Sequence, residues 1–189
     1  MGQDKALKLF LGRPLILHVI ERLSPLSEDV FIVVNGSENY LFLGLPLHPD
    51  VIPGYGPLGG IYTSLSVARN SLVAVVGCDM PFTCLPLFEY ERDIMLKTGV
   101  DVVIPSTPHG LEPLHAIYRR ETCLPFIKSA MEAGERKIIS WFHKVNIHIL
   151  SSEETEKYTP HYQAFINLNT QEELRQAEQP SGGSCPKLT

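Results

Sequence analysis

The sequence predicts an α/β domain of three layers, in which helices cover both faces of a mostly parallel sheet. Apolar runs too short for helices alternate along the chain with segments of helical period, which is typical of strands joined by crossover helices. The length of 189 residues suits one domain with a sizeable core. Hydrophobic residues make up 44% and charged residues 20% of the chain, which excludes disordered and fibrous classes.

The strands are predicted from the short apolar runs. These runs are residues 30–34, 50–52, 72–76, 101–104, 114–118 and 145–150. In the last of them Val145, Ile147 and Ile149 alternate with Asn146 and His148. This alternation predicts an edge strand that is exposed on one face.

The helices are predicted from apolar residues that recur with helical spacing. The predicted helices are residues 14–23, 61–68, 85–98, 121–133 and 171–178. Pro14 suits the first helical position, and Pro25 stops the first helix. Gly134 is suited to end the fourth helix. Thr170 and Glu173 have the spacing of a capping box ahead of the last helix.

Composition and charge narrow the class of protein further. No internal repeat or change of composition interrupts residues 1–178, so we expect one domain followed by a flexible tail at 179–189. The net charge is −5 and no basic stripe is present, which argues against a nucleic-acid partner. No run approaches the roughly 18 apolar residues that a membrane span needs, and the first residues lack a signal peptide's apolar region. We therefore expect a cytoplasmic protein whose cysteines are thiols: Cys78, Cys84, Cys123 and Cys185.

Candidate ligand-binding residues lie in the segments that follow two of the apolar runs. In open α/β sheets ligands bind beyond the carboxyl ends of the strands. Asp79 follows the run at 72–76, where its carboxylate can hold a hard cation or cap the next helix. Asn35 follows the run at 30–34, where its amide can contact a base or ribose or simply form a turn with Gly36.

A glycine-rich loop enters the helix predicted at 61–68. Its glycines allow the backbone to approach a ligand closely, and its amide groups can bind an anion or a base. The loop matches neither the Walker pattern nor G-x-G-x-x-G, so a ligand-binding loop and an ordinary turn are both open. The candidate residues are Gly56, Pro57, Leu58, Gly59 and Gly60.

Three further polar residues have two interpretations each. Lys5 can meet a phosphate as a flexible point charge or be a solvated surface lysine. Asn167 and Asn169 lie on one side of an extended segment, which suits either a ligand contact or loop bracing. The spacing of three other polar residues matches no metal motif: His109, Glu112 and His115.

Five separated motifs together resemble the molybdenum cofactor guanylyltransferase (MobA) family. The motifs are Met-Gly-Gln-Asp-Lys-Ala at 1–6, Gly-Pro-Leu-Gly-Gly-Ile at 56–61, Cys-Asp-Met-Pro at 78–81, Glu-Pro-Leu-His-Ala-Ile-Tyr at 112–118, and Ala-Phe-Ile-Asn-Leu-Asn-Thr with Glu-Glu-Leu at 164–174. They occur in the family's order and nearly span the chain. The resemblance implies a Rossmann-like nucleotidyltransferase fold.

The same resemblance implies an activity and roles for the candidate residues. The reaction is transfer of GMP from GTP to the terminal phosphate of molybdopterin, with release of pyrophosphate and with Mg²⁺ as cofactor. By position, Asp79 binds Mg²⁺ and Lys5 neutralises phosphate charge. Asn35 and residues 56–60 contact the nucleoside, whereas Asn167 and Asn169 lie on the acceptor or metal side. Such a transfer requires positioning and charge neutralisation more than a protein nucleophile. The implied partners are molybdoenzymes or cofactor-assembly proteins.

Two departures from the family pattern leave alternatives open. The family has an apolar strand, a Leu-Ala-Gly-Gly loop and a basic stretch upstream of the Met-Gly motif, so we expect a native chain longer than this one whose upstream segment supplies the central first strand. The loop between Val51 and Gly56 is shorter than the family's loop, which carries a nucleotide-contacting aspartate. The alternatives are a nucleotidyltransferase that uses CTP or a sugar phosphate, and a non-catalytic member that binds a nucleotide, pterin or partner protein.

Overall fold

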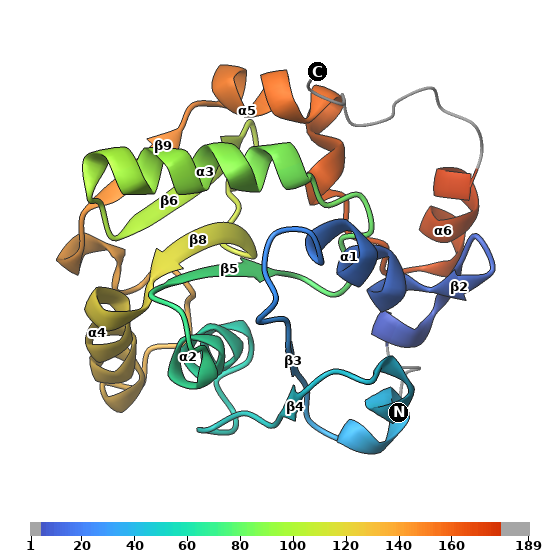
Figure 1. Ribbon diagram of the computed structural model, residues 1–189, viewed down its shortest axis with the longest axis horizontal. Helices are drawn as coiled ribbons and strands as arrows, with labels where there is room; N and C mark the ends of the chain where they lie inside the picture. Colours follow the sequence, from blue (N-terminus) through green and yellow to red (C-terminus); the bar gives the residue numbers. More distant parts are fainter. Residues whose placement is uncertain (1–4, 179–189) are drawn as a thin grey trace.

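Helices cover both faces of a central β-sheet in the computed structural model, which describes residues 5–178 (Figure 1). One face carries α2 (Pro57–Val67) and α4 (Arg120–Glu132), and the other carries α3 (Leu85–Thr98) and α5 (Ser152–Tyr158). The predicted three layers are therefore confirmed. The predicted tail at 179–189, with Cys185, lies outside the described residues.

The main sheet is mixed, whereas the sequence predicted a mostly parallel one. Its strands lie in the order β5 (Leu72–Val76), β8 (His115–Arg119), β6 (Val102–Thr107) and β7 (Gly110–Leu111), and β9 (Ile147–Leu150) lies on the other side of β6. β8 is antiparallel to both β5 and β6, whereas β9 is parallel to β6. The cause is the short connection through β7 from β6 to β8, because a parallel pair needs a crossover of a dozen or more residues.

Two small strand pairs lie outside the main sheet. β1 (Leu9–Phe10) and β2 (Arg13–Pro14) form an antiparallel hairpin, and β3 (Ile32–Val33) pairs in parallel with β4 (Leu47–His48). The strand predicted at 30–34 is thus reduced to two residues. The strand predicted at 50–52 is wrong, because Pro53 and Gly54 turn the chain there and the partner of β3 lies earlier.

Four of the five predicted helices have both ends within one residue of the prediction. They are α1 (Leu15–Leu23), α3, α4 and α6 (Gln171–Glu178). α2 starts four residues before its predicted start, because Pro57 occupies a first position that needs no backbone donor. α5 was not predicted, although Ser151 and Glu154 form a capping box at its start. Short 3-10 helices η1 (Lys5–Leu7), η2 (Ser37–Leu43), η3 (Phe142–Lys144) and η4 (Pro160–Phe165) complete the described elements.

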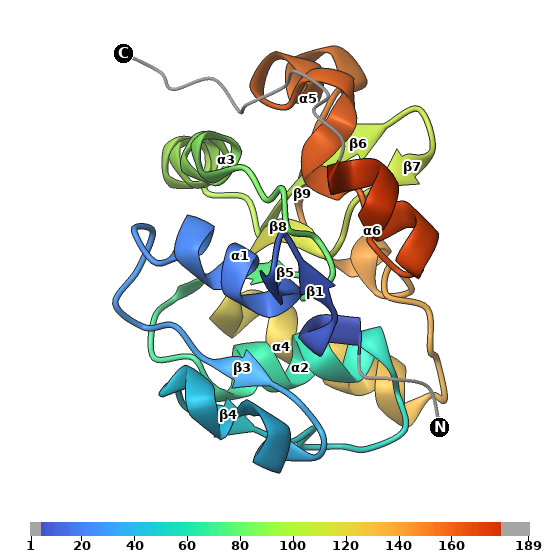
Figure 2. The same cartoon turned by 90° about the vertical axis from the view of Figure 1, so that its right-hand side faces the viewer.

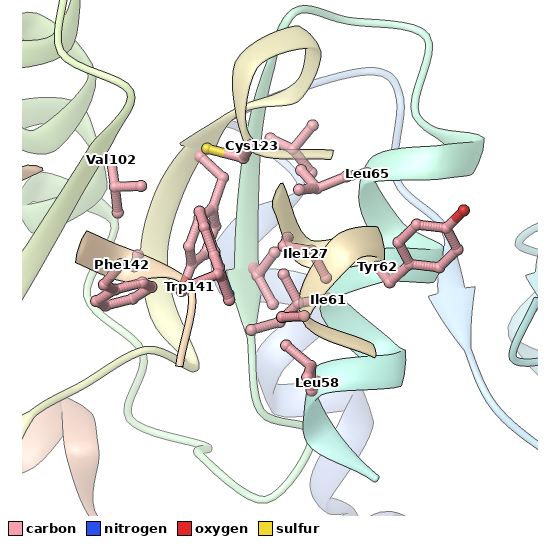
Figure 3. Packing of buried hydrophobic residues seen from close by; sticks show 14 of the residues in the cluster. Leu58, Ile61, Tyr62, Leu65, Val102, Cys123, Ile127, Trp141 and Phe142 are labelled. Carbon is pink, nitrogen blue, oxygen red and sulfur yellow. The ribbon is translucent and has the colours of Figure 1, made fainter. Parts of the chain in front are cut away.

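The core is divided by the sheet into two apolar clusters. Between the sheet, α2 and α4, Leu58, Ile61 and Leu65 pack with Ile127 and Trp141 (Figure 3). On the opposite face, Leu87, Phe88 and Met95 of α3 pack against Val103 and Ile117 of the sheet. Burying one such side chain contributes about 1.5–3 kcal/mol. No helix among residues 5–178 has the length and apolar character needed to cross a membrane.

A cavity of ≈ 680 Å³ separates β3 from β5, and no described strand lies between them. α1 and α2 provide further walls, and Gly77, Cys78 and Asp79 line it too. Arg69 just before β5 forms a 2.8 Å ion pair with Asp29 just before β3, so both strands begin at the same end of the cavity. β3 and β5 therefore run in the same direction on either side of the cavity, and the cavity lies where a strand between them would lie.

Candidate active site

Asp79 lies at the carboxyl end of β5, as predicted. The turn that carries it is hydrogen-bonded to the chain just before β8, the neighbouring strand of the sheet. The Gly77 amide donates to the Leu114 carbonyl across 3.0 Å, and the Met80 amide donates to the Gly77 carbonyl across 3.2 Å. A Cβ added at Gly77 would lie 2.9 Å from Asp79 Oδ1 and 3.1 Å from Met80 Sδ. Gly77 therefore leaves the room that the half-buried carboxylate occupies, a role that the sequence analysis missed.

The segment that contains the two predicted asparagines is attached to the Asp79 turn. The Leu168 amide donates to the Asp79 carbonyl across 3.0 Å. Lys5 Nζ donates to Asn169 Oδ1 across 2.7 Å, and the bond is exposed. The structure thus brings Asp79, Asn169 and Lys5 together from three separate parts of the sequence. Asn167 lies exposed in the same segment.

The N-terminal segment and α6 hold this asparagine segment from both sides. Leu168 is buried against Phe10, Leu15 and Leu174, and the β1–β2 hairpin lies beside α6 in both views (Figures 1 and 2). The predicted capping box is confirmed: Glu173 Oε2 accepts from the Thr170 amide across 2.9 Å, and the Glu173 amide donates to Thr170 Oγ1 across 3.1 Å. The terminus of α6 is thereby fixed next to the site.

Glu173 and a second lysine, Lys8, bind the backbone of Asn169. Glu173 Oε2 also accepts from the Asn169 amide across 2.6 Å, and Lys8 Nζ donates to the Asn169 carbonyl across 2.6 Å in a partly buried bond. The hydrogen bonds from the Asn169 and Thr170 amides lower the pKa of Glu173. Lys8 was not a candidate in the sequence analysis, because no local pattern shows that it reaches residue 169.

Asn35 is bonded to a carboxylate that the sequence analysis did not select. Asn35 Nδ2 donates to Asp50 Oδ2 across 2.7 Å, and Asn35 Oδ1 accepts from the Asp50 amide across 3.0 Å. Asn35 is exposed and Asp50 is half-buried, and they lie just beyond the ends of β3 and β4. Asp50 was placed in a strand by the sequence analysis, and its position beside Asn35 depends on the pairing of those two strands.

The structure corrects the glycine-rich loop predicted at 56–60: Gly56 precedes α2, and residues 57–60 form the first turn of that helix, because Pro57 suits its first position. The glycines of this segment have different requirements. Gly56 has φ 55° and ψ −137°, a conformation that disfavours residues with a Cβ. A Cβ at Gly59 would lie 3.3 Å from Tyr55 Cβ, whereas one at Gly60 would meet no atom within 4 Å. Pro57 and Gly60 line the cavity, but the Leu58 side chain is buried in the core. Leu58 therefore has only its backbone to offer a ligand.

His115 lies in the core with Glu91 as its polar neighbour. Both residues are fully buried, and His115 Nδ1 lies 3.4 Å from Glu91 Oε1. The Phe88 ring stacks on His115 at 3.9 Å, and Phe165 meets it edge-on. Burial lowers the pKa of His115 to about 3 and raises the pKa of Glu91 well above its ordinary value. No cluster of three His, Cys, Asp or Glu suited to a metal occurs among residues 5–178.

The buried pair of His115 and Glu91 predicts how the free energy of unfolding depends on pH, with a plateau in mildly acidic solution. Native His115 stays unprotonated below its ordinary pKa of 6.5, so stability falls as the pH decreases from there towards about 3. Native Glu91 keeps its proton above its ordinary pKa of 4.5, so stability falls as the pH rises. The two slopes cancel between pH 4.5 and 6.5. Above this window we expect a loss of up to about 1.4 kcal/mol per pH unit.

Urea unfolding of wild type and Glu91→Gln at several pH values checks this expectation. Glutamine imitates the protonated carboxyl, so the variant should lose the alkaline decline and exceed the wild type in stability at pH 8. The matched control is Glu89→Gln, because Glu89 is exposed on the same helix. A Glu91→Gln variant with the wild-type profile would contradict a protonated Glu91.

Two solved structures are similar to this chain in fold. "Molybdopterin-guanine dinucleotide biosynthesis protein A" from Archaeoglobus fulgidus is similar with a TM-score of 0.80 at 26% identity, covering 94% of this chain and 90% of that chain. 2-C-methyl-D-erythritol 4-phosphate cytidylyltransferase from Thermus thermophilus is similar with a TM-score of 0.67 over 92% of both chains, and at 14% identity this likeness concerns the fold alone. The chain therefore has the α/β nucleotidyltransferase fold.

The family follows from the sequence comparison. Residues 1–147 match the family described as "MobA-like NTP transferase domain", and the chain belongs to this family. The "Probable molybdenum cofactor guanylyltransferase" of Pelotomaculum thermopropionicum is 36% identical, over 94% of this chain and 85% of that protein. The "Molybdenum cofactor guanylyltransferase" of Desulfosudis oleivorans is 30% identical, over 94% of this chain and 87% of that protein. The resemblance inferred from the five motifs is thereby confirmed.

Proposed function

We propose that the chain transfers GMP from GTP to the terminal phosphate of molybdopterin and releases pyrophosphate. Membership of the MobA-like family and the names of relatives 30–36% identical support this reaction. The observation that carries the proposal is the convergence of Lys5, Asp79 and Asn169 at the carboxyl end of β5. This is where ligands bind in open α/β sheets.

Asp79 is the residue that would hold Mg²⁺. Its half-buried carboxylate has space beside Gly77, and Mg²⁺ in nucleotide sites typically binds one or two carboxylates together with phosphates and waters. A single carboxylate at this position therefore fits the ion. When bound, the ion neutralises charge on the triphosphate.

Lys5 is the residue that would contact the phosphates. Its ammonium group is exposed and bonded to a neutral amide oxygen, so it can exchange that bond for a stronger one to a phosphate oxygen. No general base is required, because the attacking phosphate of the acceptor is already ionised. Positioning and charge neutralisation suffice for this transfer.

Asp50 and Asn35 are suited to contact the base. Asn35 holds one oxygen of the Asp50 carboxylate, which leaves the other oxygen to accept a hydrogen bond from a ligand. A carboxylate only accepts. Guanine presents two adjacent N–H donors, at N1 and at its N2 amino group, whereas cytosine presents only its N4 amino group beside an acceptor nitrogen. This pairing favours GTP over CTP, the alternative nucleotide.

The nucleotide part of the proposal is tested by thermal unfolding with Mg²⁺ and GTP, CTP or ATP in turn. A ligand at 100 times its Kd stabilises by about 2.7 kcal/mol, which corresponds to a rise in Tm of about 5–10 °C for a domain of this size. We expect this rise with GTP only, followed by formation of the guanine dinucleotide when molybdopterin is added. A selective rise with CTP, or no rise with any nucleotide, would contradict the proposal.

Gly60→Ala tests whether the first turn of α2 approaches the nucleotide. The added methyl group meets no protein atom within 4 Å, and alanine favours a helix over glycine by about 1 kcal/mol, so the variant should be at least as stable as wild type. If the backbone at Gly60 approaches the nucleotide, the methyl group should weaken GTP binding about tenfold, a loss of about 1.4 kcal/mol, in isothermal titration. Ser66→Ala on the same helix, outside the cavity lining, is the control. Unchanged GTP affinity in Gly60→Ala would mean that this part of α2 does not contact the nucleotide.

A further inference from the structure

Two side chains of opposite charge bind the backbone amide and the backbone carbonyl of Asn169. Its amide donates to the Glu173 carboxylate across 2.6 Å, and its carbonyl accepts from the Lys8 ammonium across 2.6 Å. Hydrogen bonds to charged groups are stronger than those between neutral groups. Both backbone groups of this residue are therefore fixed, and its side chain is the part left to act on a ligand.

The Lys8 ammonium is held in place by the fold around it. The Lys8 carbonyl accepts from the Leu15 amide at the start of α1 across 2.9 Å. Phe10, two residues further along, is buried with Leu168. Lys8 is partly buried, whereas the nearby Lys5 is exposed. This difference predicts that Lys8 keeps its bond while Lys5 exchanges its own.

The Asn169 side chain depends on Lys5 in the absence of a ligand. Its Oδ1 accepts the exposed bond from Lys5 Nζ. When Lys5 turns to a phosphate of the nucleotide, Asn169 loses that partner but keeps its fixed backbone. Its side-chain amide, which both donates and accepts, is then available to a second phosphate group.

We propose that Lys8 is a positioning residue that fixes Asn169 so that its side-chain amide contacts the phosphate monoester of the acceptor. This inference rests on the proposed function for the identity of the acceptor. It also assigns an order to binding, since the nucleotide releases the Asn169 side chain before the acceptor needs it. Lys8 itself touches neither substrate.

Steady-state kinetics of Lys8→Met tests the positioning role. Methionine keeps the apolar stem of lysine and removes the ammonium group. We expect the KM for molybdopterin to rise about tenfold, a change of about 1.4 kcal/mol, with the KM for GTP within twofold of wild type. Lys8→Arg, which restores a charged donor, should recover most of the loss. The control is Lys144→Met, because Lys144 is exposed in η3.

Amide hydrogen exchange without substrates gives a second readout that does not depend on the reaction. The Asn169 amide should exchange at least tenfold faster in Lys8→Met than in wild type, whereas amides of β8 should keep their wild-type rates. A merely structural role would raise both KM values and speed exchange throughout the domain. Unchanged acceptor KM, or unchanged exchange at Asn169, would overturn the inference. If the wild type transfers no GMP, the proposed function fails, and the exchange result alone decides whether Lys8 fixes Asn169.

Discussion

Replacement of Asp79 by asparagine should lower the rate of GMP transfer by about 10²- to 10³-fold. Asparagine retains the shape of the side chain and one oxygen, but it removes the negative charge that would hold Mg²⁺ against the triphosphate. The fold should survive, because the half-buried side chain lies at the turn after β5 and its backbone supplies the bond to Leu168. The measurement is turnover with GTP, molybdopterin and Mg²⁺, together with the Tm of each variant.

Two companion variants make this result specific. Gly77→Ala places a methyl group 2.9 Å from Asp79 Oδ1, so it should displace the carboxylate and reduce turnover without removing it. Asp93→Asn removes an exposed carboxylate from α3 and should leave turnover unchanged, since an exposed ion pair contributes little. Near-wild-type turnover of Asp79→Asn would show that another residue holds the metal.

The helices α1, α3, α4 and α6 were predictable because their signals are local. The ends of α3 and α6 follow from spacing and caps that lie within a few residues, such as Thr170 and Glu173. The strand β4 was not predictable, because a two-residue strand is defined by its pairing with β3. The direction of β8 was missed for a related reason, since the local pattern does not show that β7 turns the chain back after β6.

The same distinction between local and long-range signals decides which residues of the candidate site were predictable. Asp79 and Asn35 could be found because each lies within three residues after an apolar run. Asp50 and Lys8 could not, because one depends on the pairing of β3 with β4 and the other on a contact with residue 169. Gly77 had no sequence signal either, since its role is the space that it leaves for a neighbouring side chain.

The cavity between β3 and β5 has backbone groups on both edges that face inward. In an antiparallel pair the amides point alternately towards and away from the partner. The Gly77 amide bonds to Leu114 on the chain entering β8, so the amides of Leu72, Ala74 and Val76 point towards the cavity. On the opposite edge, Ile32 and Val34 donate to the chain of β4, so the Val33 amide points inward as well.

An added strand should therefore stabilise the domain more than any other change considered. Five apolar residues buried between α1 and α2 would contribute about 10 kcal/mol, offset by about 1–2 kcal/mol per residue for ordering. The remainder of a few kcal/mol corresponds to a rise in Tm of about 10 °C. We expect this rise when Val-Ile-Ala-Val-Ile is joined ahead of residue 1 through a flexible Gly/Ser linker.

The amides of Ala74, Val76 and Val33 should become protected from hydrogen exchange in the extended chain, since only a strand satisfies both edges.

A matched pair on α2 tests the location: Ser64 and Ser66 each donate to the carbonyl four residues earlier across 2.8 Å, but of the two only Ser64 lines the cavity. Ser64→Phe should abolish the gain, and Ser66→Phe should preserve it. An equal rise with Ser-Asn-Gly-Asn-Ser in place of the apolar strand would mean that the extension acts elsewhere. Because β5 ends beside Asp79, a strand in this position would also add a rigid neighbour to the site, so the extended chain should bind GTP more tightly as well as unfold later.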